Sequence, residues 1–336
     1  MPNILGMLID GVNKTMNSSF TNRGALVALI DTGALAADHI DEALTVANIR
    51  PDIPAWRLFI DRVMMVLGGL ALAFSVMFFV AYNWDAIGKF AQFGMVEAFI
   101  AVSVIGFWKL GGDTLSGKIS LLVGSLLVGV LLALYGQTYQ TGADPWQLFA
   151  NWALLIIPWA IIARFAAVWI IWLSLINLAV MLYFQTSLFF GSAPEMVWAL
   201  FGVNVVALIA GEYLGQRWDW LSERWALRLL AFGSGSTITW LACLAIYEPA
   251  TVHSSALLVW VLGLFFIYYI YQAKIRDLFM LAGGCLSVIT VTVAFLQWLF
   301  MDKFSEFGML IISAALIGMG AASAFWLRKV QREWQA

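Results

Sequence analysis

The chain has 336 residues, of which 62% are hydrophobic and only 11% are charged, and its mean hydropathy is +0.89. Soluble domains carry about 45–50% apolar and about 25% charged residues, so this composition excludes a water-soluble fold. The formal charge of -2 provides no basic surface for nucleic acid, which excludes a nucleic-acid partner. We therefore expect a polytopic protein whose first partner is the lipid bilayer.

The first 61 residues differ from the rest of the chain. They lack a cationic start and a long apolar run, so they do not resemble a signal peptide. Apolar residues at helical spacing predict two short amphipathic helices, one ending at Gly33 and one running from Asp38 to before Pro51. About 60 residues are marginal for an independent core, so we expect residues 1–61 to form a cytosolic segment that packs on the membrane domain or on a partner.

Ten apolar segments follow, each long enough to cross the ~30 Å hydrocarbon layer as a helix. None shows the alternation of a transmembrane β-strand, so the predicted fold is all-α. The predicted domains are the cytosolic segment 1–61, a ten-helix transmembrane domain over 62–328 and a cytosolic tail over 329–336. The ten predicted spans are 63–82, 90–108, 119–135, 148–163, 165–184, 196–213, 225–247, 256–271, 278–300 and 308–327.

The lysines and arginines predict the orientation of these spans, because cytoplasmic loops retain positive charge. Alternating the ten spans places sixteen of the eighteen basic residues on one side and leaves Lys89 and Lys303 on the other. A wrong number of spans would scramble this distribution. The split therefore predicts that both termini are cytoplasmic.

Glu97 is the most prominent charged residue within a predicted span, about seven residues from its outer end. Two interpretations remain open. The carboxyl group either hydrogen-bonds a neighbouring helix as a packing contact, or it serves as a proton-linked functional group. In both cases we expect it to face the protein interior and to contact polar groups such as Asn83, Gln137 and Asn151.

The stretch from Leu134 to Trp152, which joins the third and fourth spans on the outer side, is unusually polar for its surroundings. It is interpreted either as an ordinary turn anchored by aromatic residues at the headgroup level or as one wall of an outward-facing cavity. Glycines and Pro145 would permit a tight or re-entrant backbone there.

The polar groups of the outer side lead to a hypothesis of function. We expect an outward-open cavity between the first five spans that binds or moves a small neutral, cationic or amphiphilic solute, because Lys89 is the only base nearby. The alternative is an accessory or scaffold subunit that binds another membrane protein through residues 1–61 or through the tenth span, which is rich in small residues. The predicted substrate-binding residues are Asn83, Asp85, Glu97, Gln137, Tyr139, Gln140, Asp144, Asn151 and Gln185.

Enzymatic chemistry has little support in the sequence. Cys243 and Cys285 lie in apolar runs without metal-binding spacing, and no nucleophile elbow, zinc-binding helix or acidic metal cluster occurs in a span. The outer side offers isolated carboxylates and one histidine, His253, which do not form a catalytic set. We therefore expect no catalytic residue, metal or cofactor.

Two tracts resemble a known family. They are Phe79-Val80-Ala81-Tyr82-Asn83-Trp84 and the tract from Ala133 to Asp144, ALYGQTYQTGAD. Both are similar to the bacterial membrane-protein family designated domain of unknown function 2157, over the cytosolic segment and at least the first six spans. The resemblance implies a short helical cytosolic start, an Asn-Trp turn after the first span and location in the bacterial inner membrane. It implies no activity, substrate or catalytic residue.

Overall fold

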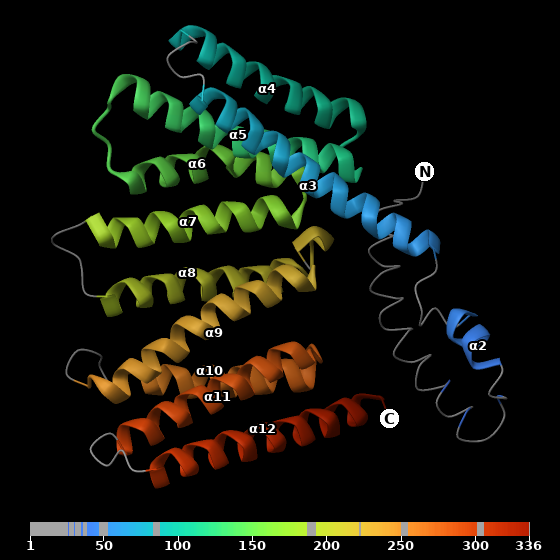
Figure 1. Ribbon diagram of the computed structural model, residues 1–336, viewed down its shortest axis with the longest axis vertical. Coiled ribbons are helices and arrows are strands. Elements are labelled where there is room, and N and C mark those ends of the chain that lie inside the picture. The colour runs from blue at the N-terminus through green and yellow to red at the C-terminus, as the bar shows by residue number, and fades with distance from the viewer. Residues whose placement is uncertain are drawn as a thin grey trace. The chain divides into compact units, whose positions relative to one another are not determined.

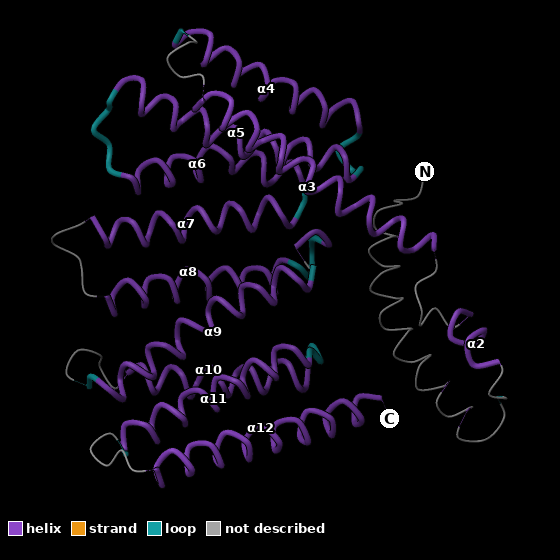
Figure 2. Tube along the Cα trace, in the orientation of Figure 1, coloured by secondary structure: helices purple, strands orange, loops and turns teal. Residues whose placement is uncertain are grey.

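The computed structural model describes residues 26, 30, 35, 39–46, 53–82, 88–186, 193–221, 223–249, 255–300 and 306–335. Within these ranges the regular structure is helical and contains no strand, as Figure 2 shows. Ten of the described helices are long and apolar enough to cross a membrane. The prediction of an all-α protein with ten spans is therefore confirmed.

The helices extend beyond several of the predicted spans. Helix α3 begins at Ile53, ten residues before the predicted start, so the boundary placed after residue 61 falls inside a helix. The boundary after residue 328 likewise falls inside α12. The second short helix expected in residues 1–61 is present as α2. Of the first, only residues 26 and 30 are described, and both are helical. The helices are α2 Ile40–Val46, α3 Ile53–Tyr82, α4 Lys89–Leu110, α5 Leu115–Tyr139, α6 Pro145–Ala163, α7 Ala166–Thr186, α8 Ala193–Leu214, η2 Asp219–Leu221, α9 Arg224–Tyr247, α10 Ser255–Tyr269, η3 Ile270–Lys274, α11 Leu278–Leu299 and α12 Glu306–Gln335.

Local sequence explains several helix ends. The Thr114 hydroxyl caps α5 by accepting a hydrogen bond from the Gly117 N–H at 3.1 Å. Helix α6 begins with Pro145, whose fixed φ suits the first helical position. At the ends of α5 and α6, Gln140 and Arg164 adopt the left-handed conformation that terminates a helix, with φ of 43° and 44°.

The chain divides into two compact units. The first contains α3, α4, α5 and the second half of α6, Leu155–Ala163, and its central helix is α5, which packs against both α3 and α4 (Figure 1). Gly124 of α5 allows this close packing, because an added Cβ would lie 2.5 Å from the Trp159 ring and 3.1 Å from Ser103. Val96 and Leu134 are buried between α4 and α5.

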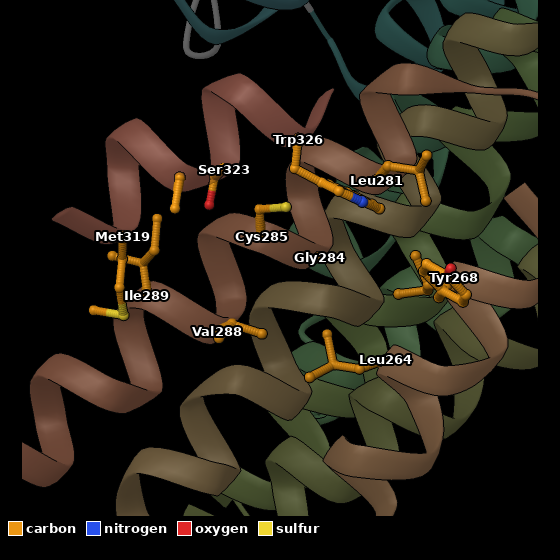
Figure 3. A pocket seen from close by; sticks show the side chains of 12 residues that line it. Leu264, Tyr268, Leu281, Gly284, Cys285, Val288, Ile289, Met319, Ser323 and Trp326 are labelled. Atoms are coloured by element: carbon orange, nitrogen blue, oxygen red, sulfur yellow. The ribbon is translucent and has the colours of Figure 1, made fainter. Parts of the chain in front are cut away.

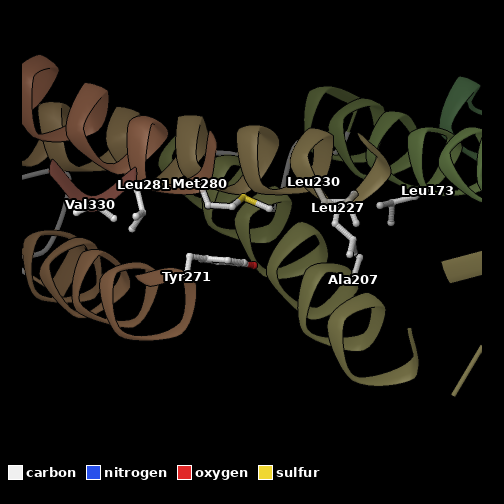
Figure 4. Close-up of a cluster of buried hydrophobic side chains, with 8 residues drawn as sticks. All are labelled: Leu173, Ala207, Leu227, Leu230, Tyr271, Met280, Leu281 and Val330. Carbon is white, nitrogen blue, oxygen red and sulfur yellow. The ribbon is translucent and has the colours of Figure 1, made fainter. Parts of the chain in front are cut away.

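The second unit contains residues 143–154 and the described residues from Arg164 onward. Helix α9 is its centre and packs against α7, α8, α10 and α11, whereas α12 packs against α11. Figure 4 shows its core, to which α7, α8, α9, η3, α11 and α12 contribute side chains. The core comprises Leu173, Ala207, Leu227, Leu230, Tyr271, Met280, Leu281 and Val330.

Candidate functional site

A cluster of charged side chains lies at one end of the second unit, where α8 and α10 end and α9 and α11 begin. The Arg224 guanidinium donates to both Glu212 carboxylate oxygens at 3.1 and 3.2 Å and to Asp277 Oδ2 at 2.7 Å. Arg228 donates to the same Asp277 oxygen at 3.2 Å, and the Tyr271 hydroxyl donates to Glu212 Oε1 at 2.9 Å. We call these five residues the charged cluster.

Asp277 is the centre of the charged cluster and is 4% exposed. Its second oxygen, Oδ1, caps α11 by accepting from the Phe279 N–H at 3.0 Å. Burial raises the pKa of the Asp277 carboxyl, but the hydrogen bonds and positive charges of Arg224 and Arg228 outweigh that effect. The pKa of Asp277 is consequently lower than its ordinary value of 3.8.

The charged cluster has no surplus charge, because two carboxylates face two guanidiniums. It contains no histidine or cysteine, and its tyrosine hydroxyl is hydrogen-bonded to a carboxylate. Within the described ranges no group of three His, Cys, Asp or Glu side chains could hold a metal ion. The hydrogen bonds and ion pairs of the charged cluster therefore connect α8, η3, α9 and α11.

Neutral polar groups inside the second unit also pair between helices. Asn204 of α8 donates to the Asn177 side-chain oxygen of α7 at 2.7 Å. The Ser287 hydroxyl of α11 contacts Thr239 Oγ1 at 2.6 Å and accepts from the Trp260 indole N–H at 2.8 Å. Such pairs satisfy polar groups that would otherwise face hydrocarbon. These pairs were not predicted, because a single sequence does not show which amides and hydroxyls of different helices face each other.

Glu97 lies on α4 about 12 Å along the helix axis from Lys89, at 1.5 Å per residue. Its side chain is exposed, whereas Gln92, Val96 and Ser103 on the opposite side of α4 are buried. It has no hydrogen bond or ion pair to any described residue. The expectation that Glu97 faces the interior was wrong for the first unit, because Val96 and Ser103 occupy the side of α4 that packs on α5.

The nine predicted substrate-binding residues divide between the two units and the undescribed part of the chain. Asn83 and Asp85 lie outside the described residues. The other seven are all exposed, and within the described ranges no hydrogen bond or ion pair joins any two of them. Glu97, Gln137, Tyr139 and Gln140 belong to the first unit, and Asp144, Asn151 and Gln185 belong to the second.

The polar tract from Leu134 to Trp152 forms a tight connection between two helices. Helix α5 continues to Tyr139, and α6 starts at Pro145 after a short loop in which Gly142 has a φ of +63°. The Tyr139 ring packs against Tyr135 with centroids 4.9 Å apart. The tract is therefore a turn between two helices rather than a re-entrant segment.

Two cavities, both within the second unit, are lined mainly by apolar side chains. One of about 600 Å³ lies along α7, α8 and η2 and includes Trp169, Trp172 and Leu221. The other, of about 330 Å³, lies between α10, α11 and α12 and includes Tyr268, Cys285 and Trp326 (Figure 3). None of the seven described predicted site residues lines either cavity.

Comparison with known proteins supports the resemblance noted in the sequence. The family described as Predicted membrane protein (DUF2157) matches residues 28–169. The match ends four residues into α7 and thus covers four complete spans, fewer than the six expected from the sequence. No curated protein and no solved structure matches the chain. The protein is therefore a membrane protein that is similar to this family over residues 28–169.

Proposed function

We propose that this protein is an assembly subunit that binds another membrane-spanning chain through the exposed side of α4. The observation that carries the proposal is the exposure of Glu97 deep in a spanning helix. A carboxyl group at that depth costs a few kcal/mol when it faces lipid, and such residues are typically buried against a polar partner. A partner helix would supply the contact that the first unit lacks.

The residues around Glu97 suit close contact with a helix. Ala91, Gly94, Ala98 and Ala101 are exposed on the same side of α4, and we call them, together with Glu97, the α4 face. An added Cβ at Gly94 would meet no atom within 4 Å. Small residues at this spacing let two backbones approach and bring polar side chains within hydrogen-bonding distance. The partner is therefore expected to present a basic or amide side chain opposite Glu97.

The experiment compares two variants of the full-length protein purified in mild detergent from native membranes. Glu97→Leu should abolish recovery of the partner and leave the thermal stability of the isolated protein unchanged or higher, because leucine is favourable in lipid. Phe99→Leu is the matched control, since Phe99 is also exposed but lies about 200° around the helix from Glu97. The control should leave partner recovery unchanged.

A photo-crosslinking residue at Gly94 identifies what covers the α4 face. Crosslinks to a different membrane-spanning chain, absent when the probe is moved to Phe99, support the proposal. Crosslinks only within the chain, or only to a second copy of it, overturn it. The proposal also fails if Glu97→Leu destabilises the isolated protein while partner recovery stays the same.

The second candidate function is a carrier whose substrate-binding residues are the nine outer polar residues from Asn83 to Gln185. The favouring observation is that the described members, which include the consecutive Tyr139 and Gln140, are exposed and available to a solute. Native mass spectrometry discriminates the two functions. A lone protein carrying a co-purified polar solute, lost in Gln137→Ala and Tyr139→Ala variants, favours the carrier.

A further inference from the structure

The cavity between α10, α11 and α12 has the dimensions of a site for one lipid chain. Among its lining residues on α11, Ile289 is the farthest from the start of that helix. It follows Leu278 by eleven residues, or roughly 16 Å at 1.5 Å per residue. One leaflet of a ~30 Å hydrocarbon layer has about that depth. The Cys285 thiol and the Ser323 hydroxyl are the two small polar groups of the cavity.

One end of this cavity is aromatic and meets the end of the second unit that carries the charged cluster. The Tyr268 and Trp326 rings stack there with centroids 6.1 Å apart, and Figure 3 shows Trp326 near Leu281 at that end of the cavity. Tyrosine and tryptophan favour the headgroup level of a bilayer. The cavity therefore runs from the headgroup level into the hydrocarbon.

The exposed cations at the same end include Lys274, Arg276, Arg328 and Lys329. The lining positions of α12 are 319, 322, 323 and 326, and Lys329 follows Trp326 by three residues and continues that side of the helix. Within the described ranges, Lys274, Arg276 and Arg328 have no acidic partner. Lys329 approaches Glu333 only at 3.9 Å, with both side chains exposed.

Two acids at this end are already paired with other residues, and Glu333 can offset only one of the positive charges. Asp277, next to Arg276, accepts from Arg224 and Arg228, and Glu212 accepts from Arg224 and Tyr271. The positive charge at the mouth of the cavity is therefore left for a ligand. An anionic headgroup is attracted by each nearby lysine or arginine.

We propose that this cavity binds an anionic phospholipid. One acyl chain lies along α10, α11 and α12, and the phosphate lies against Lys274, Arg276 and Lys329. Arg328 lies about 200° around α12 from Trp326 and adds a longer-range attraction. The site is independent of the α4 face, since all of its residues belong to the second unit. A zwitterionic lipid would match the chain-binding part of the cavity but not its charge.

The test is native mass spectrometry of the full-length, delipidated protein titrated with phosphatidylglycerol or with phosphatidylcholine of the same acyl chains. The unmodified protein should bind phosphatidylglycerol at least tenfold more tightly. Replacing the four cations by glutamine should reduce that preference to within about twofold. The matched control, Arg164→Gln with Arg217→Gln, removes two basic residues that belong to other helix junctions of the second unit and should preserve the preference.

A second variant tests the chain-binding part of the site. Ala322→Phe fills the cavity from α12 and should weaken binding of both lipids, whereas Gly284→Ala should be tolerated because its added Cβ would lie 3.6 Å from the nearest atom. Equal binding of the two lipids by the unmodified protein overturns the proposal. So does an equal loss of preference in the four-cation variant and the control, provided that their thermal stabilities match the unmodified protein.

Discussion

Asp277 illustrates how one side chain can join several helices. Its carboxyl group begins α11 as a cap and holds Arg224 and Arg228 of α9, while Arg224 extends the contact to Glu212 of α8. Breaking a buried ion pair is costly because the remaining charge stays buried and unpaired. Asp277 is almost fully buried, so it is the member whose loss matters most.

Replacing Asp277 by asparagine should therefore destabilise the protein by about 2–3 kcal/mol, less than a fully buried pair because Arg224 is partly exposed. Thermal unfolding in detergent measures the effect. Glu333→Gln is the control, because its pair with Lys329 is long and exposed and should contribute almost nothing. A drop no larger than that of the control would show that the charged cluster does not stabilise the fold.

The pH dependence of stability follows from the lowered pKa of Asp277. The stabilisation by the ionised Asp277 carboxyl is fully present at pH values above the ordinary pKa near 3.8. It is lost as the pH falls through the lower pKa of the folded protein, because the carboxyl binds a proton more tightly in the unfolded chain than in the folded one. Melting temperatures measured from pH 6 downward should fall below about pH 4. The fall should be smaller in Asp277→Asn. An identical fall in both proteins would assign the acid sensitivity to other groups.

At the scale of the helix, close approach in the first unit depends on small residues of α5. Gly124 lies against the Trp159 ring of α6 and Ser103 of α4, and the Ser120 hydroxyl donates to the Ser103 carbonyl at 2.9 Å. Lipid provides no hydrophobic force between helices, so such fitting of shape and these hydrogen bonds hold the unit together. The positions where α5 contacts α4 and α6 should tolerate little added volume.

Gly124→Ala should destabilise the protein by about 1–3 kcal/mol, because the new methyl group would force the Trp159 ring or α4 to move. Gly136→Ala in the same helix is the matched control. Its added Cβ would lie 3.9 Å from the nearest atom, and alanine favours the helix, so stability should be unchanged or slightly higher. Thermal unfolding of the two variants measures the difference. Equal melting temperatures would contradict the prediction.

At the scale of the whole molecule, charge is sorted along the membrane normal. In the second unit, every described lysine and arginine lies at the end where α7, α9 and α11 begin and α8, α10 and α12 finish. The positive-inside rule predicts that this end is cytoplasmic. Since ten spans are an even number, both ends of the spanning region would then be cytoplasmic, as the sequence predicts.

Cysteine labelling in intact cells tests this orientation in a background with Cys243 and Cys285 replaced by serine. An impermeant thiol reagent should label cysteines at Thr141 and Thr186, which lie at outer helix ends, and should spare cysteines at Ser116 and Gln216 until the membrane is permeabilised. Labelling of the cysteine at Gln216 in intact cells would reverse the orientation. Labelling of all four would contradict the number of spans.

The all-helical class, the ten spans and their approximate limits can be predicted from the sequence alone. They depend on the hydropathy of each local stretch of sequence. A run of about 20 apolar residues is long enough to cross the membrane, and lipid requires every backbone group to be hydrogen-bonded within the segment. The family resemblance was also readable from two short tracts. The direction in which Glu97 points was not readable, because both sides of α4 are largely apolar.

The side-chain contacts between helices that are far apart in the sequence are visible in the tertiary structure and not in the sequence. Arg224 and Asp277 are 53 residues apart, and in the sequence each resembles an ordinary solvated loop charge. Their pairing depends on how α9, α10 and α11 cross, and on the π-helical turn Ile270–Lys274 that places Tyr271 beside Glu212. Hydropathy is a local and additive property, whereas the side of a helix that contacts its neighbour depends on the packing of all the helices together.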